Sequence, residues 1–530
     1  MTATIPSGAA MLGAKTPEAM VAMLNQSVCG HAAENPALLP EGPPVPPTPS
    51  FPSKEWRREP ITHRLIFTPH EETRQNGKNP ICATYPKTDL GNCERFVMRY
   101  GLNCRYSQPF KSWYVWDHHR WQQDQTGIIK EFAKETVIRI GDEAACVDGA
   151  TGQSDLYRWA AASQAKNKID SLVDLAKSTL SISPDQLDTH HALLNCQNGT
   201  LDLTTGEFTK PRRDDLITKI AGCSYDPAAN CPTWDRFLNQ IMAGNKNLVG
   251  FLQRATGYSL SGFTGERAFF LCHGAGANGK STFLNTLLAI MGDYGHTVEP
   301  DTYCVSRSDS VRNDLAGLKG VRFAVSTESR KGKRLDESIV KQLTGGGDRI
   351  RARFLFQESF EFQPECKIWW AFNSTPRITD STESIWSRVR MIPFTVTIKE
   401  SDRDIRLPEK LRNEAPGILN WMLAGYKEYQ RIGLAEPEEV RVATAEYREN
   451  EDTFADFISL MCNLDPTLSC ESSSLYEAYR KWMGWEAPDE DIISQRKFGF
   501  EMNDRGFKRD KDSATGRKIY HGIRPKNGGF

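Results

Sequence analysis

Residues Phe269–Met291 read FFLCHGAGANGKSTFLNTLLAIM, and this stretch decides the fold. It contains the pattern G-x-x-x-x-G-K-[ST], which runs from Gly274 to Ser281 and is typical of a phosphate-binding loop. The apolar run Ala268–Cys272 before the loop predicts a buried strand, and the apolar spacing along Thr282–Met291 predicts a helix. A strand, a glycine-rich loop and a helix are together the context in which this motif binds a nucleotide.

The residue types of the loop suit a polyphosphate. Glycines allow the backbone conformations that turn successive N–H groups inward, and the helix N-terminus adds positive potential. We expect Lys280 to contact the β- and γ-phosphates of ATP and Ser281 to be a ligand of Mg²⁺. A glycine-rich turn with a chance lysine is the alternative, which the flanking strand and helix disfavour. The residues expected to bind the nucleotide are Gly274, Ala275, Gly276, Ala277, Asn278, Gly279, Lys280, Ser281 and Thr282.

Composition limits the class of protein. A chain of 530 residues is too long for one domain, and 66 lysines and arginines balance 67 acids, so only local patches can indicate nucleic acid. No apolar run approaches the roughly 18 residues of a membrane span. The N-terminus lacks a signal-peptide pattern, so we expect a cytoplasmic protein with no membrane partner. The 13 scattered cysteines, without a C-x-x-C pair, argue against a disulfide framework or a zinc site.

Changes in composition divide the chain into four expected segments. Residues 1–60 include the proline-rich run Gly42–Pro52 and are expected to be disordered. Residues 61–240 favour an α+β N-terminal domain, and residues 241–430 an α/β ATPase domain. Residues 431–530 favour a charged helical connector followed by a winged-helix domain.

Two further apolar strands supply candidate catalytic groups. The run Gly320–Glu328 ends in an acid, and Cys366–Phe372 is followed by Asn373. At the carboxyl edge of a parallel sheet, Glu328 would handle Mg²⁺ or the attacking water, and Asn373 would orient that water. A solvated glutamate at a strand end is the alternative for Glu328.

Arginines near the ATPase motifs predict two kinds of contact. Arg349, Arg351 and Arg353 alternate with apolar residues and precede Ser359–Phe362, which predicts a hairpin with a basic face that contacts phosphate backbones. A salt-bridged exposed face is the alternative. Arg388 and Arg390 come just before a predicted strand, where an arginine finger from a neighbouring subunit is expected. A structural salt bridge is again the alternative.

The C-terminal residues predict a helix, Gln495–Arg505, followed by a basic hairpin. This layout is typical of a winged helix-turn-helix that contacts DNA, and a basic solvated tail is the alternative. The expected contacts in this unit are Lys497, Lys508, Arg509, Lys511, Arg517 and Lys518. Further upstream, Asp117, His118 and His119 favour the turn of an aromatic hairpin over a metal site.

Seven motifs occur in the order typical of one known family. They are Thr88–Phe96, Leu194–Leu203, Leu252–Gly262, Gly276–Thr282, Lys341–Asp348, Asn373–Arg377 and Trp386–Phe394. On these motifs the chain resembles the C-terminal helicase region of phage and plasmid primases, a family shared with the poxvirus primase-helicase. The resemblance covers roughly the last four fifths of the chain.

The resemblance implies a superfamily 3, AAA+-related helicase that forms a homo-oligomeric ring, usually a hexamer, on single-stranded DNA. It assigns Lys280 and Ser281 to the first nucleotide motif, Glu328 to the second and Asn373 to the sensor. Arg388 is the expected trans-acting finger, with Arg390 as second choice. Within the ring, the expected DNA contacts are Lys341, Arg351 and Arg353 of the hairpin region Lys341–Phe362, or alternatively the basic loop with Lys331, Lys333 and Arg334.

These expectations together describe an ATP-dependent DNA helicase or replication protein of a phage, prophage or satellite element. It would act on single-stranded and forked DNA in the cytoplasm of a bacterial host, with a separate primase or polymerase as a partner. The first 60 residues are too short and proline-rich for a primase-polymerase domain, so we expect none there. An origin-binding initiator whose ATPase drives assembly, and a packaging or remodelling ATPase, are the alternatives.

Overall fold

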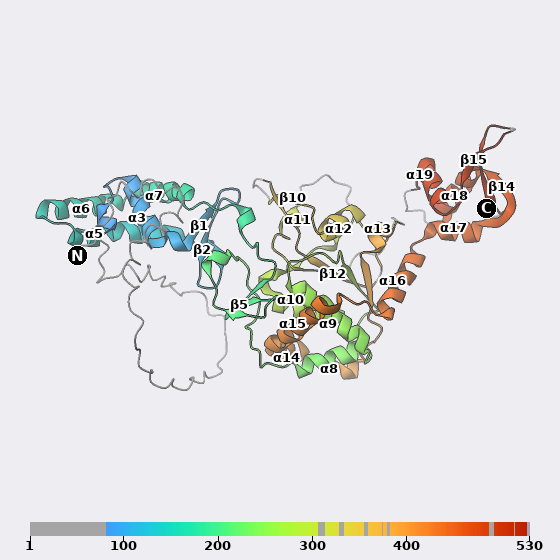
Figure 1. The fold of residues 1–530 in the computed structure, drawn as a ribbon, viewed down its shortest axis with the longest axis horizontal. Helices are drawn as coiled ribbons and strands as arrows, with labels where there is room; N and C mark the ends of the chain where they lie inside the picture. Colours follow the sequence, from blue (N-terminus) through green and yellow to red (C-terminus); the bar gives the residue numbers. More distant parts are fainter. Residues whose placement is uncertain are drawn as a thin grey trace, which may run out of the picture.

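The computed structural model describes residues 81–305, 313–327, 333–354, 359–373, 375–378, 382–486, 492–513 and 515–526. The proline-rich segment, Glu328, Lys331 and the tip of the expected arginine hairpin therefore lie outside the described residues. Along the longest axis, an N-terminal unit, an ATPase core and a C-terminal unit follow one another (Figure 1). Among the described residues, no helix combines the length and the apolar character needed to cross a membrane.

The N-terminal unit combines a helical cluster with two small antiparallel sheets, which agrees with the expected α+β region. Its sheets have the orders β1-β2-β3 and β4-β5-β6. The helices are α3 (Asp89–Tyr100), α4 (Ile128–Ile138), α5 (Ile140–Glu143), α6 (Ala150–Ser163) and α7 (Lys166–Thr179). The strands are β1 (Cys104–Ser107), β2 (Ser112–Trp116), β3 (Trp121–Gln123), β4 (Leu193–Cys196), β5 (Gly199–Asp202) and β6 (Phe208–Thr209).

Local signals explain two elements of this unit. Helix α3 begins after Thr88, whose side chain accepts a hydrogen bond from the N–H of Gly91, a normal N-cap. Between β2 and β3, the Asp117 carboxylate accepts hydrogen bonds from the N–H groups of His119 and Arg120 at 2.8 and 2.7 Å. This confirms the predicted turn. No group of three potential metal ligands occurs among the described residues.

The ATPase core is built on a five-stranded sheet of order β13-β7-β12-β9-β8, in which every neighbouring pair is parallel. The expected α/β core is therefore present and is consistent with a P-loop core. The register aligns Phe372 of β12 with His273 of β7, and Ala371 with Thr327 of β9, so the carboxyl ends of these three strands share one edge. The strands are β7 (Phe269–His273), β8 (Gly295–Thr297), β9 (Phe323–Thr327), β12 (Lys367–Phe372) and β13 (Val389–Pro393).

Both faces of this sheet are covered, which explains why its strands are continuously apolar. On one face, Phe270, Cys272 and Trp369 join a core cluster with α8, α9, α10 and α15, which lie below the sheet in Figure 1. On the other face, Leu271 and Trp370 pack with α12 and the hairpin β10–β11. The covering elements are α8 (Pro232–Ile241), α9 (Lys246–Leu260), α10 (Lys280–Met291), α11 (Asn313–Ala316), α12 (Glu337–Thr344), β10 (Ile350–Ala352), β11 (Phe360–Phe362), α13 (Glu383–Trp386), α14 (Leu407–Asn413) and α15 (Ala415–Ile432).

Helix α15 packs directly on α9, and the sequence analysis did not anticipate it. A Cβ atom on Gly257 of α9 would lie 2.2 Å from the backbone nitrogen of Tyr426, and one on Gly425 of α15 would lie 1.9 Å from the carbonyl oxygen of Gln253. The two backbones approach this closely because both contact positions are glycine. This contact fixes α14 and α15 beside the phosphate loop.

The C-terminal unit has its own core, in which Phe454, Phe457, Trp482, Phe498 and Tyr520 pack together. Its sheet is antiparallel and has the order β14-β16-β15. The predicted helix and the basic hairpin after it are both present. The elements are α16 (Glu438–Asn450), α17 (Thr453–Met461), β14 (Cys462–Glu471), α18 (Ser472–Glu486), α19 (Gln495–Asp504), β15 (Arg509–Lys511) and β16 (Lys518–Pro525).

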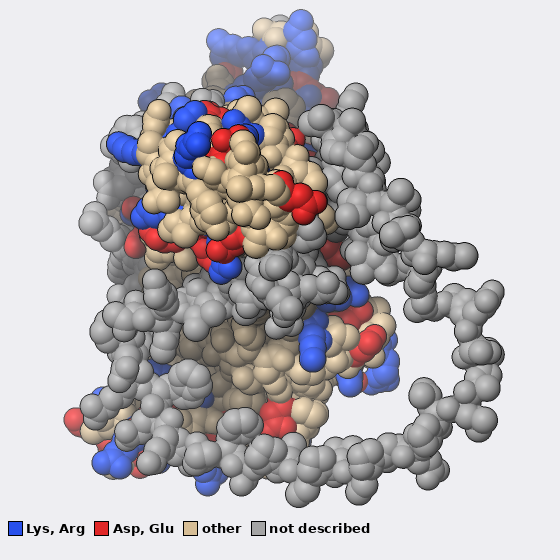
Figure 2. Space-filling model, turned by 90° about the vertical axis from the view of Figure 1, so that its left-hand side faces the viewer, with Lys and Arg blue, Asp and Glu red and all other residues tan. Residues whose placement is uncertain are grey.

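Charges of both signs mix on the end of the N-terminal unit that Figure 2 turns toward the viewer, with neutral residues between them. This agrees with the formal net charge of −1. No single-sign field covers that end, so surfaces suited to nucleic acid are better sought nearer the ATPase core and in the C-terminal unit.

Candidate nucleotide-binding site

The phosphate loop is held tightly between β7 and α10. Gly279 has φ of 85°, and a Cβ atom there would lie 2.5 Å from the Ile241 side chain of α8. At Gly274, a Cβ atom would lie 2.2 Å from the carbonyl oxygen of Phe394, just after β13. Both positions therefore require glycine, and α8 and the segment after β13 fix the conformation of the loop.

Lys280, the first residue of α10, folds back into the loop and is only 5% exposed. Its Nζ donates hydrogen bonds to Gly274 O at 2.7 Å, Asn278 Oδ1 at 3.1 Å and Asn373 Oδ1 at 3.2 Å. Burial lowers the pKa of Lys280 from its usual value. All three acceptors are neutral oxygens, so a phosphate oxygen would offer the ammonium a stronger, charge-assisted partner.

A cavity of about 250 Å³ opens beside this lysine. It lies at the carboxyl edge of the sheet, where Thr327 ends β9 and Asn373 follows β12. The hydroxyl-bearing Ser281 and Thr282 also line it, which is the donor chemistry that a phosphate-bound Mg²⁺ requires. The lining residues are Gly276, Ala277, Asn278, Gly279, Lys280, Ser281, Thr282, Thr327, Ala371, Phe372 and Asn373. The expected loop residues and Asn373 thus meet in space, while Glu328 lies outside the described residues.

The segment after β13 also supports the loop. Asn278 Nδ2 donates hydrogen bonds to Phe394 O, at 3.2 Å, and to Ala275 O, and the N–H of Ile398 donates to Ala277 O at 2.8 Å. Burial, followed by the nearby charge of Lys280, lowers the pKa of His273, so the loop begins beside a neutral imidazole at pH 7.

A second cavity, of about 650 Å³, adjoins the first, and Thr282 lines both. Its walls come from α8, from the segment after β13 and from the start of α14. Its lining mixes apolar side chains with five charged ones, and Gln240 contributes an amide; the charged residues are Arg236, Asp402, Arg403, Asp404 and Lys410. The sequence analysis missed these residues, because they belong to no motif and come from separate parts of the chain. They include Thr233, Phe237, Gln240, Ile398, Ile405, Leu407 and Pro408.

Arg388 and Arg390 have different environments. Arg388 precedes β13, and its carbonyl accepts the N–H of Phe269 at 2.8 Å, so it lies at the edge of the sheet opposite the phosphate loop. Five strand residues separate these edges by about 16 Å. The Arg388 Nε donates to Thr344 Oγ1 at 3.1 Å, and burial lowers its pKa. Arg390 lies inside β13, which corrects the expectation that it precedes the strand, and it forms an ion pair with Glu436.

The hairpin β10–β11 carries the expected arginines on one face. Arg349, Arg351 and Arg353 are exposed, whereas Ile350 and Ala352 between them are buried. Part of this face is paired within the chain, because Arg349 Nε lies 3.9 Å from Glu361 Oε2 and Arg351 Nη2 donates to Ser359 Oγ at 3.0 Å. Lys341 lies on α12 and is half-buried.

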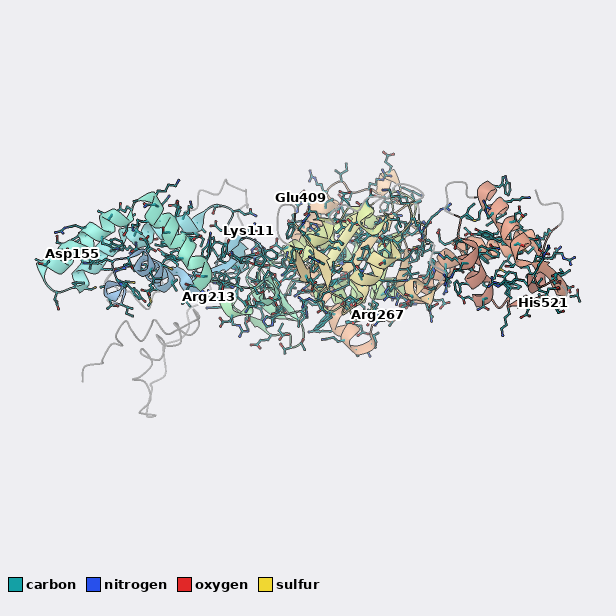
Figure 3. The ribbon with its side chains drawn as sticks, turned by 90° about the horizontal axis from the view of Figure 1, so that it is seen from above. Lys111, Asp155, Arg213, Arg267, Glu409 and His521 are labelled. Carbon is teal, nitrogen blue, oxygen red and sulfur yellow. The ribbon has the colours of Figure 1, made fainter. Side chains whose placement is uncertain are left out.

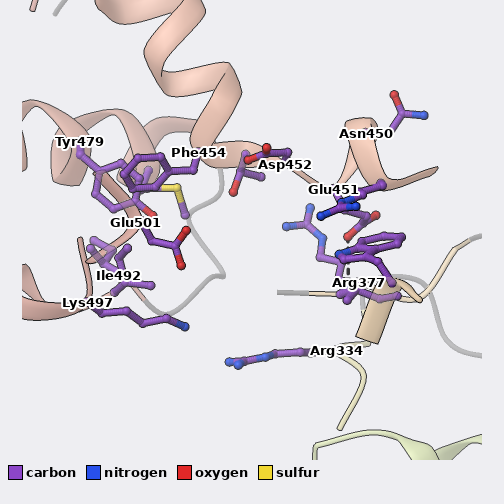
Figure 4. A pocket seen from close by; sticks show the side chains of 16 residues that line it. Arg334, Arg377, Asn450, Glu451, Asp452, Phe454, Tyr479, Ile492, Lys497 and Glu501 are labelled. Carbon is purple, nitrogen blue, oxygen red and sulfur yellow. Dashed lines mark hydrogen bonds between the residues drawn. The ribbon is translucent and has the colours of Figure 1, made fainter. Parts of the chain in front are cut away.

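The expected basic residues of the C-terminal unit are all exposed, and Arg517 pairs with Glu471 at 2.5 Å. They are Lys497, Lys508, Arg509, Lys511, Arg517 and Lys518. His521 of the same hairpin lies near one end of the molecule in Figure 3, beyond the central ATPase core. Nearer the core, a cavity of about 340 Å³ lies between α19 and the ATPase, with Lys497, Arg334 and Arg377 around it (Figure 4).

Two family models match the chain. Residues 93–243 match the family described as "D5 N terminal like", and residues 272–388 match the "Family of unknown function (DUF5906)". A solved structure described as "The A form apo structure of NrS-1 C terminal region-CTR" aligns with a TM-score of 0.40 and 10% identity, covering 79% of this chain and 94% of that one.

Curated relatives are viral and distant. "Putative helicase L207/L206" of Acanthamoeba polyphaga mimivirus is 26% identical over 420 residues, covering 70% of this chain and 43% of the relative. "Putative helicase 022R" of Frog virus 3 (isolate Goorha) is 27% identical over 264 residues, covering 45% and 26%. The chain thus spans less than half the length of either relative.

A phosphate loop at the carboxyl edge of a parallel five-stranded sheet defines the class as a nucleotide-binding α/β protein. The chain carries D5_N and DUF5906 domains and is similar to distant viral proteins described as putative helicases, so the resemblance inferred from its motifs is confirmed.

Proposed function

We propose that this protein is an ATP-dependent DNA helicase that takes part in the replication of a phage, prophage or other mobile element. The observation that carries the proposal is the hydrogen bond between Lys280 and Asn373, which joins a phosphate-loop lysine to an amide at the end of a neighbouring parallel strand. The viral helicase relatives support the same activity.

Each residue of the site has a role that follows from its position. Lys280 leaves its neutral acceptors to bind the β- and γ-phosphates of ATP. Asn373, released from the lysine, orients the attacking water. The hydroxyl of Ser281 would hold Mg²⁺, which would supply positive charge to the phosphates. Glu328 directly follows Thr327, which lines the cavity, and we assign it to the metal or the water.

The nucleotide base occupies the second cavity. This assignment is supported by the shared wall residue Thr282, by the apolar side chains Phe237 and Ile398, and by the amide of Gln240, which can hydrogen-bond a base edge. The cavity volume of about 650 Å³ also leaves room for the sugar.

Arg388 completes the site of a neighbouring subunit in a homo-oligomeric, hexameric ring. Its position at the opposite edge of the sheet, about 16 Å from its own phosphate loop by strand length, supports action in trans. The arginines of β10–β11 contact the DNA backbone in this ring.

The C-terminal unit acts as a winged-helix DNA-binding domain. Its element order α17-β14-α18-α19-β15-β16 supports this assignment, with α19 as the recognition helix and the basic hairpin β15–β16 as the wing. The separate core of this unit also favours a second candidate function, an origin-binding initiator whose ATPase drives assembly.

Unwinding of a forked DNA duplex with ATP and Mg²⁺ tests the proposal, with Lys280→Ala as the matched control. If the wild type separates the strands and the Lys280→Ala variant does not, the protein is an ATP-driven motor. The initiator is supported instead by two results together. The chain hydrolyses ATP without separating the strands, and it gives a sequence-specific DNA footprint that disappears when residues 436–530 are deleted. ATP hydrolysis that single-stranded DNA does not stimulate supports a packaging or remodelling ATPase.

A further inference from the structure

A fourth cavity, of about 410 Å³, lies where the N-terminal unit meets the ATPase core. Its floor is apolar and includes Phe110, Tyr114 and Leu187 from the N-terminal unit. Lys219 and Lys319 line it from two sides. Lys111, next to Phe110 in the chain, marks this junction in Figure 3. The cavity is separate from the nucleotide site and shares no lining residue with it.

The charge of this cavity suits an anionic ligand. Three cations line it, Arg120, Lys219 and Lys319, against a single carboxylate, that of Asp188. The Asp188 carboxylate accepts hydrogen bonds from the N–H and the hydroxyl of Thr218, both at 2.6 Å, which hold it in place and leave its negative charge. Arg120 is paired with Asp293, so the two lysines outnumber the one carboxylate that lines the cavity.

Lys319 is fixed in place by its neighbours. Its Nζ donates to Pro184 O at 2.8 Å and lies 6.0 Å from the ring centroid of Phe110. Burial lowers its pKa from the usual value. A phosphate group nearby would stabilise the charged form of Lys319. This interaction would offset part of the free-energy cost of burying the ammonium group.

Aromatic packing connects the cavity to the arginine hairpin. Phe354, which also lines the cavity, directly follows Arg353. The Phe110 ring contacts Phe354 and Phe360 edge-on, with centroid distances of 6.4 and 5.1 Å, and these two rings stack on each other at 5.5 Å. The loop end of the hairpin, where Phe354 follows β10 and Phe360 begins β11, is therefore in contact with the cavity wall, next to the residues that carry the arginines.

We propose that this cavity binds a nucleotide of single-stranded DNA, with the base against the apolar floor and the adjoining phosphates on Lys219 and Lys319. Alternating aromatic and basic groups are the general means of holding single strands without sequence preference. A volume of about 410 Å³ suits one nucleotide. The inference rests on the proposed function, since it requires that single-stranded DNA be the substrate.

Binding of the full chain to a fluorescein-labelled oligothymidine, followed by anisotropy at several salt concentrations, tests this site. We expect Lys219→Gln to weaken binding about 3–10-fold and to reduce the salt slope by about 0.7, as the loss of one single-strand phosphate contact requires. Lys166→Gln is the matched control, because Lys166 is exposed at the start of α7, outside the cavity. Equal affinity and slope for Lys219→Gln and the wild type overturn the proposal.

Photo-crosslinking with an oligothymidine that carries 4-thiothymidine provides a second, direct measurement. We expect crosslinked peptides from residues 108–125 or 316–320, and crosslinks confined to the arginine hairpin and the C-terminal unit overturn the proposal. A wild-type chain that does not bind single-stranded DNA contradicts the proposed helicase function itself. If the chain binds DNA normally but Lys219 makes no contribution and these crosslinks are absent, only the proposal that the cavity binds DNA is contradicted.

Discussion

The Nζ atom of Lys280 lies 3.2 Å from the Oδ1 atom of Asn373, although 93 residues separate them in the chain. The parallel pairing of β7 with β12, which aligns His273 with Phe372, brings the two side chains together. In the proposed function, the γ-phosphate of ATP would compete for the same ammonium, so nucleotide binding would release the amide and free it to hold water. The hydrogen bond would then link occupation of the site to its catalytic competence.

Substituting Asn373 tests this link. We expect Asn373→Ala to lower kcat for ATP hydrolysis by about 10²–10³-fold, with the Kd for ATP changed by less than about threefold, as for loss of a transition-state contact. Asn373→Asp should instead weaken ATP binding, because its carboxylate would pair with Lys280 and compete with phosphate. Steady-state hydrolysis and binding of a fluorescent ATP analogue measure both. If Asn373→Ala loses binding as fully as Lys280→Ala, the amide only positions the lysine.

The two arginines near β13 should differ in their effects. We expect Arg388→Ala to abolish hydrolysis in a pure population while ATP binding remains. Mixing it with Lys280→Ala chains should restore part of the turnover, because mixed rings pair an intact phosphate loop with an intact finger. Arg390→Ala should act on stability instead, since it breaks the ion pair with Glu436. A mixture without any rescued turnover contradicts the trans role of Arg388.

The local part of the nucleotide site could be predicted from the sequence, because strand, loop and helix around Lys280 are adjacent in the chain. Asn373 could also be predicted, since the apolar run before it indicates a parallel strand. The second cavity could not, because Gln240, Ile398 and Leu407 meet only after α8 and α14 pack beside the loop. The different environments of Arg388 and Arg390 depend on where β13 begins, and strand ends are poorly specified by local pattern.

The second cavity makes a prediction about nucleotide affinity. Gln240 is exposed on α8 and lines this cavity, so Gln240→Trp should fill the space without disturbing the core. We expect KM for ATP to rise about tenfold or more, with a smaller change in kcat, because mainly ground-state binding is lost. Asn239→Trp, at the neighbouring exposed position outside the cavity, is the control. Equal KM values for the two variants would place the base elsewhere.

Lys367 should make stability depend on pH. It begins β12, is 1% exposed, and donates hydrogen bonds to Ser261 O and Glu365 O. Burial, with a further contribution from Arg322, lowers its pKa from 10.5 to about 7. The pKa of Lys367 is lower in the folded chain than in the unfolded chain. Between pH 7 and pH 10.5, Lys367 therefore binds more protons in the unfolded chain. The contribution of Lys367 to stability therefore rises with pH across this window.

The comparison with Lys367→Met isolates this effect from other titrating groups. We expect the free energy of unfolding of the wild type, relative to the variant, to increase by roughly 2 kcal/mol between pH 7 and pH 9. Urea denaturation of both proteins at each pH measures the difference. A difference that stays constant over this range would mean that Lys367 titrates normally in the folded protein.

Helix α16 ties the segment after Asn373 to the C-terminal unit. The Tyr447 hydroxyl donates to Pro376 O, and a Glu451 oxygen accepts the N–H of Ile378 at 3.1 Å. The next residue, Asp452, accepts two hydrogen bonds from Arg505 at 2.7 and 2.9 Å. Among these residues, Ile378, Glu451 and Asp452 line the cavity of Figure 4. These contacts connect residues 376–378, which follow β12 in the chain, to the unit that carries the basic hairpin.

If this connection transmits DNA binding to the ATPase, Arg505→Ala should reduce the stimulation of hydrolysis by DNA while basal hydrolysis is unchanged. We expect stimulation to fall about 3–10-fold, which corresponds to a coupling of roughly 1 kcal/mol. Arg441→Ala is the matched control, because Arg441 lies on α16 and pairs locally, with Glu438. Stimulation that Arg505→Ala leaves intact would mean that the two units bind DNA and hydrolyse ATP independently. Loss of both basal and stimulated hydrolysis would instead indicate a structural role for the Arg505–Asp452 pair.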